Sequence, residues 1–233
     1  MDIYNELLQL LEKNKISNIN LNIITANNQF DLLEKIAKQF DIQCNIFKCE
    51  HFKNVLQLVH NFNNDQNCNG IYIDNNSYTY KTKGLIYSNI NPKKDVNVLN
   101  PVSLGLILHK DYFIFPPEIE LILKILNNYN LINTSILIID NFNFLSSILA
   151  SILITKGSIV TQCNYQNIYY YYASTSDIII CLTDITELKD NNHSVYINFG
   201  NNNTKLYNKD YLDSLLNLYI IYNFIRLIKI KGE

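Results

Sequence analysis

Segments with helical hydrophobic spacing alternate along this chain with short apolar runs that are typical of strands. In the first third, residues 3–15, 29–40 and 54–65 have the helical spacing, and residues 19–25, 42–49 and 70–74 are apolar runs between them. Two parallel strands need a crossover that is long enough to hold a helix. The alternation therefore predicts an α/β fold with a largely parallel sheet.

A second series of the same kind begins near residue 115. Residues 116–129 and 143–157 predict helices, and residues 135–140, 158–164, 176–182 and 194–200 predict strands. Residues 211–229 are apolar on nearly every side, which predicts a buried final helix. We expect two α/β lobes with a cleft between them, residues 1–114 plus 211–233 and residues 115–210. The second has the strand–helix–strand order of a Rossmann-like nucleotide-binding domain.

Composition excludes several classes of function. The formal net charge is −2 and Arg226 is the only arginine, so no basic surface for nucleic acid or an anionic membrane is expected. Charged and amide residues interrupt the apolar runs, so we expect no membrane span. The five cysteines form no Cys-x-x-Cys pair, and the first residues do not have the pattern of a secretory leader, so we expect reduced thiols in the cytoplasm. We expect no metal site, and we interpret Cys44 and Cys49 as small thiols of a strand.

The stretch "INPKKDVNVLNPVSLG" (residues 90–105) holds two prolines around a charged turn. It resembles the pattern I-x-P-x-K-D-V-D-G-x-x-P-x-N-x-G of the bifunctional methylenetetrahydrofolate dehydrogenase/cyclohydrolases, the FolD family. The residues that match without a gap are Ile90, Pro92, Lys94, Asp95, Val96, Pro101 and Gly105. The flanking segments extend the resemblance over roughly residues 50–203. The stretch also suits a simple loop that caps a helix, stiffened by its prolines, in which Lys94 and Asp95 form a weak surface pair.

The resemblance implies an enzyme of one-carbon folate metabolism. Such an enzyme oxidises 5,10-methylenetetrahydrofolate to the 5,10-methenyl form with NADP and hydrolyses that product to 10-formyltetrahydrofolate. The implied partners are the folate substrate and a second copy of the chain in a homodimer. Two alternatives stay open at this point: a noncatalytic relative that only binds a ligand or partner, and an enzyme that retains the cyclohydrolase activity alone.

The resemblance also implies the folate-site residues, and this chain departs from the family at several of them. Phe30 stands for the family's tyrosine, and Glu34 falls on its lysine with Lys35 one step further. Asp74 stands for the family's glutamine and Asn97 for the aspartate that holds the pterin. We expect catalytic roles for Lys35, Asp74 and Asn97, and substrate contacts from Phe30, Asp95 and Pro101.

The expected dinucleotide turn has lost its glycines. The positions that the resemblance assigns to the cofactor are Asp140, Asn141, Phe142 and Asn201. A glycine would let the backbone approach a phosphate, whereas the Asp140 carboxylate carries the same charge as that phosphate. At about 4 Å and an effective dielectric constant near 20, two such charges repel by about 4 kcal/mol, roughly a thousandfold in affinity. We therefore expect NADP to bind weakly or not at all.

Overall fold

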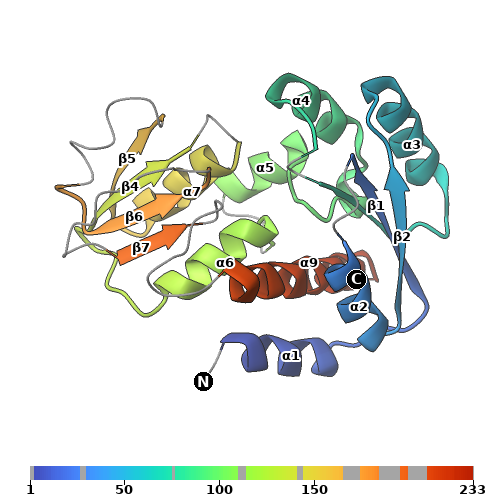
Figure 1. Ribbon diagram of the computed structural model, residues 1–233, viewed down its shortest axis with the longest axis horizontal. Helices are drawn as coiled ribbons and strands as arrows, with labels where there is room; N and C mark the ends of the chain where they lie inside the picture. Colours follow the sequence, from blue (N-terminus) through green and yellow to red (C-terminus); the bar gives the residue numbers. More distant parts are fainter. Residues whose placement is uncertain are drawn as a thin grey trace. The chain divides into compact units, whose positions relative to one another are not determined.

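The computed structural model describes residues 3–26, 30–74, 77–109, 114–140, 144–164, 174–183, 195–198 and 209–232. The chain divides into two compact units (Figure 1). Unit 1 comprises Met1–Pro117 and Leu215–Glu233, and unit 2 comprises Glu118–Ser214.

Unit 1 is built on a parallel sheet with the strand order β2-β1-β3. Its strands are β1 (Ile19–Thr25), β2 (Ile42–Lys48) and β3 (Gly70–Ile73). Its helices are α1 (Ile3–Lys13), α2 (Asp31–Gln39), α3 (Phe52–Asn64), α4 (Tyr80–Asn89), the short 3-10 helix η1 (Pro92–Lys94), α5 (Pro101–Leu108) and most of α9 (Lys209–Gly232).

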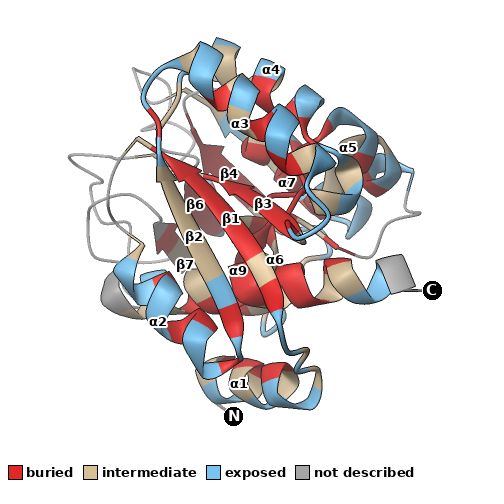
Figure 2. Ribbon diagram, turned by 90° about the vertical axis from the view of Figure 1, so that its right-hand side faces the viewer, coloured by how far each residue is buried: buried red, intermediate tan, exposed pale blue. Residues whose placement is uncertain are grey.

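Helices cover both faces of this sheet. The chain moves from β1 out to β2 and then back across β1 to β3, and right-handed crossovers place α2 and α3 on opposite faces. Phe47 of β2 packs on Phe62 of α3, with ring centroids 4.7 Å apart. On the other face, Gly70 of β3 leaves room for Phe224 of α9. Figure 2 shows β1 and β3 buried and the edge strand β2 mostly half-buried.

Unit 2 repeats the plan with four parallel strands in the order β5-β4-β6-β7. The strands are β4 (Ser135–Ile139), β5 (Ile159–Cys163), β6 (Ile178–Cys181) and β7 (Val195–Asn198), and the helices are α6 (Pro117–Leu126), which starts in unit 1, and α7 (Phe144–Thr155). The central strands β4 and β6 are buried, whereas the edge strand β5 is partly exposed. Gly157 follows the end of α7 with a positive φ of 91°, a conformation that glycine adopts readily, and the chain then enters β5.

The predicted fold class is confirmed: the chain is an α/β protein with two parallel sheets. Each helix and strand that the sequence predicted is present, with ends that differ by a few residues. Within the described ranges, two α-helices were not predicted. They are α4 and α5, which lie on either side of the proline-bracketed turn.

Candidate functional site

The strand order of unit 1 marks a binding position. In open α/β sheets, ligands bind beyond the carboxyl ends of strands where the chain leaves neighbouring strands in opposite directions, and in this sheet that position lies between β1 and β3. Thr25 ends β1 and Asp74 directly follows β3. The Thr25 hydroxyl donates to Asp74 Oδ2 at 2.8 Å, so the two strand ends meet through their side chains.

A second hydroxyl completes this group. Ser77 Oγ donates to Asp74 Oδ2 at 2.5 Å and accepts from the Ala26 backbone N–H at 2.9 Å. The Thr25 and Ser77 hydroxyl oxygens lie 3.2 Å apart. Thr25 is buried, whereas Asp74 and Ser77 are half-buried. We call Thr25, Asp74 and Ser77 the switch-point cluster. It holds a partly accessible carboxylate in an orientation that two hydroxyls fix.

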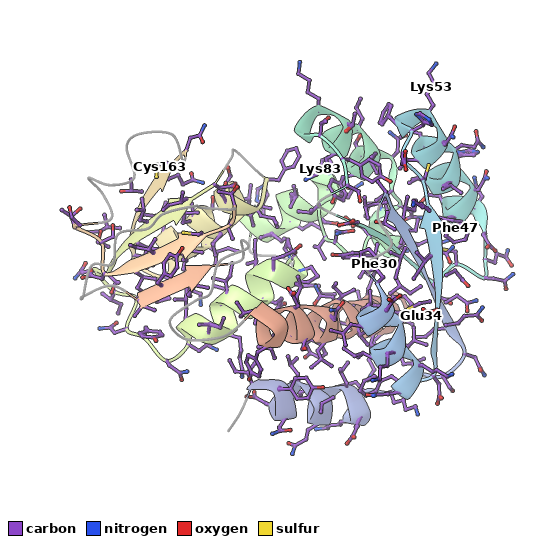
Figure 3. The ribbon with its side chains drawn as sticks, in the orientation of Figure 1. Phe30, Glu34, Phe47, Lys53, Lys83 and Cys163 are labelled. Atoms are coloured by element: carbon purple, nitrogen blue, oxygen red, sulfur yellow. The ribbon has the colours of Figure 1, made fainter. Side chains whose placement is uncertain are left out.

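An aromatic pair lies on the α2 face of the same sheet. Phe30 directly precedes α2, and its ring meets the Tyr72 ring edge-to-face at 6.0 Å between centroids. Tyr72 of β3 is buried, whereas Phe30, which is labelled in Figure 3, is half-buried. The predicted substrate residue Phe30 therefore has a ring that Tyr72 holds in place and that stays partly accessible.

Lys35 does not share the helix face of Phe30. The helix α2 is regular from its start, where the Glu34 N–H bonds to the Phe30 carbonyl at 2.9 Å. Four residues return almost to the same helix face and a fifth adds about 100°, so Glu34 lies on the side of Phe30 and Lys35 does not. Both side chains are exposed (Figure 3 labels Glu34). Burial and then the Glu34 carboxylate raise the pKa of the Cys44 thiol on β2 to about 12. The catalytic role of Lys35 stays a prediction.

The charged turn within residues 90–105 is held by hydrogen bonds between its side chains and backbone groups. Lys94 Nζ donates to the carbonyl oxygens of Phe62 at 2.8 Å, Asn63 at 3.1 Å and Asp65 at 2.7 Å. These groups lie at the carboxyl end of α3, where carbonyls lack helical partners and a cation is favoured. Capping of a helix by this turn was one of the two sequence interpretations. The expected surface pair of Lys94 with Asp95 is wrong, because Asp95 is buried inside the turn.

The Asp95 carboxylate holds the turn together from within. Its Oδ1 accepts from the Val98 N–H at 3.0 Å and its Oδ2 from the Asn100 N–H at 2.6 Å. Burial raises the pKa of Asp95 to about 7, although the backbone N–H donors around it act in the opposite direction. Pro101 begins α5 and is exposed, and Asn100 caps that helix by accepting from the Val102 N–H at 2.8 Å.

Asn97 pairs with the end of β3. Its Oδ1 accepts from the Ile73 N–H at 2.7 Å, and its Nδ2 donates to the Ile73 carbonyl at 3.0 Å. The side chain is fully buried, and each end of its amide bonds to a backbone group. The next residue, Val98, stands at the glycine of the family pattern and has φ 58°, a left-handed conformation that strains a β-branched residue. The turn therefore fixes the residue directly before Asp74.

Sequence reasoning identified Asp74, Phe30, Asp95 and Asn97 but missed two members of the switch-point cluster. Thr25 and Ser77 belong to no recognised spacing pattern. The available signal was position, because Thr25 ends a predicted strand and Ser77 closely follows another. In the described ranges, no three His, Cys, Asp or Glu side chains gather as metal ligands would. Nor does any helix there combine the length and apolar character needed to cross a bilayer.

In unit 2, Asp140 occupies the corresponding position beyond β4. The strand order reverses between β4 and β6, and the Asp140 N–H bonds to the Cys163 carbonyl at 3.1 Å. The Asp140 residue is buried. Asn141, Phe142 and Asn201 lie outside the described residues. The prediction that a dinucleotide phosphate binds weakly here still rests on the sequence, in which residues 140–143 include a carboxylate and no glycine.

Comparisons with known proteins identify similar chains. No family model matches this sequence. The bifunctional protein FolD of Thermosipho africanus is 28% identical over 134 residues, which cover 56% of this chain and 49% of that protein. The bifunctional protein FolD of Fervidobacterium nodosum is 28% identical over 182 residues, covering 76% of this chain and 60% of that protein. The chain spans about half the length of the curated relatives it matches first.

Solved structures match over nearly the whole chain. A 5,10-methylenetetrahydrofolate dehydrogenase from the silkworm Bombyx mori gives a TM-score of 0.77 at 16% identity and covers 99% of this chain and 95% of its own. The Trypanosoma brucei methylenetetrahydrofolate dehydrogenase-cyclohydrolase, solved with NADP and an inhibitor, gives 0.75 at 13% identity with the same coverage. At these identities the likeness shows a shared fold.

Proposed function

We propose that this chain, a distant member of the FolD family, binds a tetrahydrofolate carrying a one-carbon unit beyond the carboxyl ends of β1 and β3. The observation that carries this proposal is the switch-point cluster. It sets a half-buried carboxylate, Asp74, at the position where sheets of this order bind ligands. The partly accessible ring of Phe30, held by Tyr72, offers an aromatic surface on the same sheet for a pteridine ring.

The reaction that best suits these residues is the hydrolysis of 5,10-methenyltetrahydrofolate. This step adds water to the methenyl carbon, breaks the bond from that carbon to N5 and releases one proton, which gives 10-formyltetrahydrofolate. The step needs only the folate and water, so it does not depend on the turn at Asp140. The methenyl substrate carries a positive charge on its bridge, and the Asp74 carboxylate attracts such a ligand to the site.

Two measurements on the purified chain test the proposal. Calorimetry with tetrahydrofolate should show saturable binding, and the methenyl absorbance should decay faster with protein than in buffer alone. Phe30→Ala should weaken binding roughly tenfold, since ring stacking contributes about 1–3 kcal/mol. Asp41→Asn is the matched control, because Asp41 is an exposed carboxylate that pairs with Lys15. Absence of folate binding by the unchanged chain contradicts the proposal. Binding without any acceleration of hydrolysis reduces it to the noncatalytic alternative.

The NADP-dependent oxidation of 5,10-methylenetetrahydrofolate is a second candidate. It is favoured by the full-length match, which includes unit 2, to relatives described as dehydrogenases. If the Asp140 charge is the obstacle, NADP should bind weakly to the unchanged chain and more tightly to Asp140→Asn. Formation of NADPH by the unchanged chain would establish this second activity. The homodimer that the resemblance implies is a separate proposal, which light scattering on the purified protein tests.

A further inference from the structure

Asp74 and Asn97 both adjoin Ile73, Asp74 as the next residue of the chain and Asn97 through hydrogen bonds to the Ile73 backbone. Asp74 brings a half-buried carboxylate to the strand end, and Asn97 brings a fully buried amide to the backbone of Ile73. We propose that Asp74 binds the amidine edge of the pteridine ring, meaning the ring N–H and the adjacent 2-amino group, and that Asn97 positions Asp74 without contacting the ligand. This inference rests on the proposed function and names the contact that selects the ligand.

The contacts within the charged turn support Asp74 over the other candidates. The Asn97 amide bonds to the N–H and to the carbonyl of Ile73, and its side chain is fully buried, so a ligand could reach it only if this buried contact opened. Asp95 is buried, and both of its carboxylate oxygens accept backbone N–H groups of the turn. Asp74, in contrast, is a half-buried carboxylate at the strand end.

The switch-point cluster makes Asp74 suited to a ligand that offers N–H donors. Hydroxyl donors from Thr25 and Ser77 bond to its Oδ2, and Ser77 is itself oriented by the Ala26 N–H. A carboxylate offers oxygen acceptors, so its partners in a ligand are N–H or O–H donors. The adjacent Ile73 is fixed at its N–H and at its carbonyl by Asn97, so the backbone that carries the carboxylate has a set position.

The amidine edge of a pteridine has the matching pattern. It presents two N–H groups side by side, and a carboxylate can accept from two such groups at once. A 2,4-diaminopteridine has a more basic ring nitrogen than the 2-amino-4-oxo ring of a folate. When that nitrogen is protonated, its hydrogen bond to a carboxylate carries charge on both partners. The proposal therefore predicts that this chain prefers 2,4-diaminopteridines, and that the preference depends on Asp74.

The test measures binding of three ligands by calorimetry: tetrahydrofolate, its analogue without the 2-amino group, and a 2,4-diaminopteridine. The unchanged chain should bind the analogue about 10-fold to 100-fold more weakly than tetrahydrofolate, and the diamino compound more tightly. Asp74→Asn, which keeps the shape and removes the charge, should bind tetrahydrofolate more weakly by a similar factor. It should also lose most of the discrimination among the three ligands. Asp41→Asn is the control and should match the unchanged chain.

The outcomes separate this inference from the proposed function. If the unchanged chain binds tetrahydrofolate and its 2-amino-free analogue equally well, the amidine contact is wrong while the folate site stands, and no variant is needed for that result. Equal affinity of Asp74→Asn and the unchanged chain for tetrahydrofolate, with circular dichroism showing both folded, also overturns it. If the unchanged chain binds none of the three ligands, the proposed function fails together with the inference.

Discussion

Replacement of Asn97 by aspartate tests how the charged turn supports the site. In the present structure the Asn97 amide donates to the Ile73 carbonyl and accepts from the Ile73 N–H. An aspartate keeps the acceptor but loses the donor, and it sets a carboxylate oxygen against a carbonyl oxygen. Only an amide provides a donor and an acceptor of this size, so we expect the exchange to be costly although the two side chains have nearly the same shape.

The expected loss of stability follows from burial. Asn97 and Ile73 are both fully buried, so the unpaired Ile73 carbonyl cannot turn to water. One unsatisfied buried backbone group costs about 1–3 kcal/mol, and a buried charge that loses its complement costs about 3–5 kcal/mol. Asn97→Asp should therefore lower the free energy of unfolding by roughly 4–8 kcal/mol at neutral pH. Asn97→Ala should lower it by about 2–6 kcal/mol, because both groups of Ile73 lose their partner.

Urea unfolding at neutral pH measures these differences. Asn61→Asp is the matched control, because Asn61 is exposed on α3 and its Oδ1 accepts a hydrogen bond from Gln57 Nε2 at 3.1 Å. An aspartate oxygen can accept the same bond. It should change the unfolding free energy by less than about 0.5 kcal/mol. If Asn97→Asp is as stable as the unchanged chain, then the two hydrogen bonds between the Asn97 amide and the Ile73 backbone do not exist in solution. Asn97 could then contact the folate, as the sequence predicted.

Three further substitutions have defined expectations. Gly70→Ala places a Cβ 2.5 Å from Phe224 Cε2 and should destabilise unit 1 by about 1–3 kcal/mol in urea unfolding. Gly105→Ala, whose Cβ meets nothing within 4 Å, should instead stabilise the protein by about 0.5–1 kcal/mol. The reverse order of stability would contradict the packing of α9 on β3. The folded-state pKa of Asp95 is raised from 3.8 to about 7, so the free energy of unfolding should fall as pH rises from about 4 to 7. Asp95→Asn should make this fall with pH smaller. If the pH dependence of the variant equals that of the unchanged chain, the pKa shift is refuted. Lys35→Ala should leave folate binding and methenyl hydrolysis unchanged, because Lys35 is turned away from the face of Phe30, and a loss of hydrolysis would restore the predicted catalytic role.

Much of the fold could be predicted from the sequence because its pattern is local. Apolar runs such as residues 135–139 gave β4 directly, and the helical spacing of residues 3–13 gave α1. The helix α4 was missed because its sequence, YKTKGLIYSN, mixes a glycine and polar residues with few apolar ones. The helix α5 was missed because its short sequence is apolar all round, which leaves no helical period to detect. The strand order also could not be predicted, because it depends on where each crossover returns.

The candidate site was predicted less completely than the fold, because hydrogen-bond partners are not local. Asp74 was found through the resemblance, whereas Thr25 and Ser77 contact it from 49 and 3 residues away and leave no motif. Asn97 was expected at the ligand, and nothing in its own sequence context shows that Ile73, 24 residues away, engages both ends of its amide. The burial of Asp95 was also hidden, since a charged turn between prolines suits a solvent-exposed loop equally well.

A crystal structure of the chain with tetrahydrofolate bound would locate the proposed site. We predict the pteridine ring beyond the carboxyl ends of β1 and β3, with the ring N–H and 2-amino nitrogens about 2.7–3.0 Å from the Asp74 carboxylate. Asn97 should keep both of its bonds to Ile73 in that complex. A ring bound away from these strand ends, or held by Asn97 after it has released Ile73, would show that Asp74 is not the pteridine ligand.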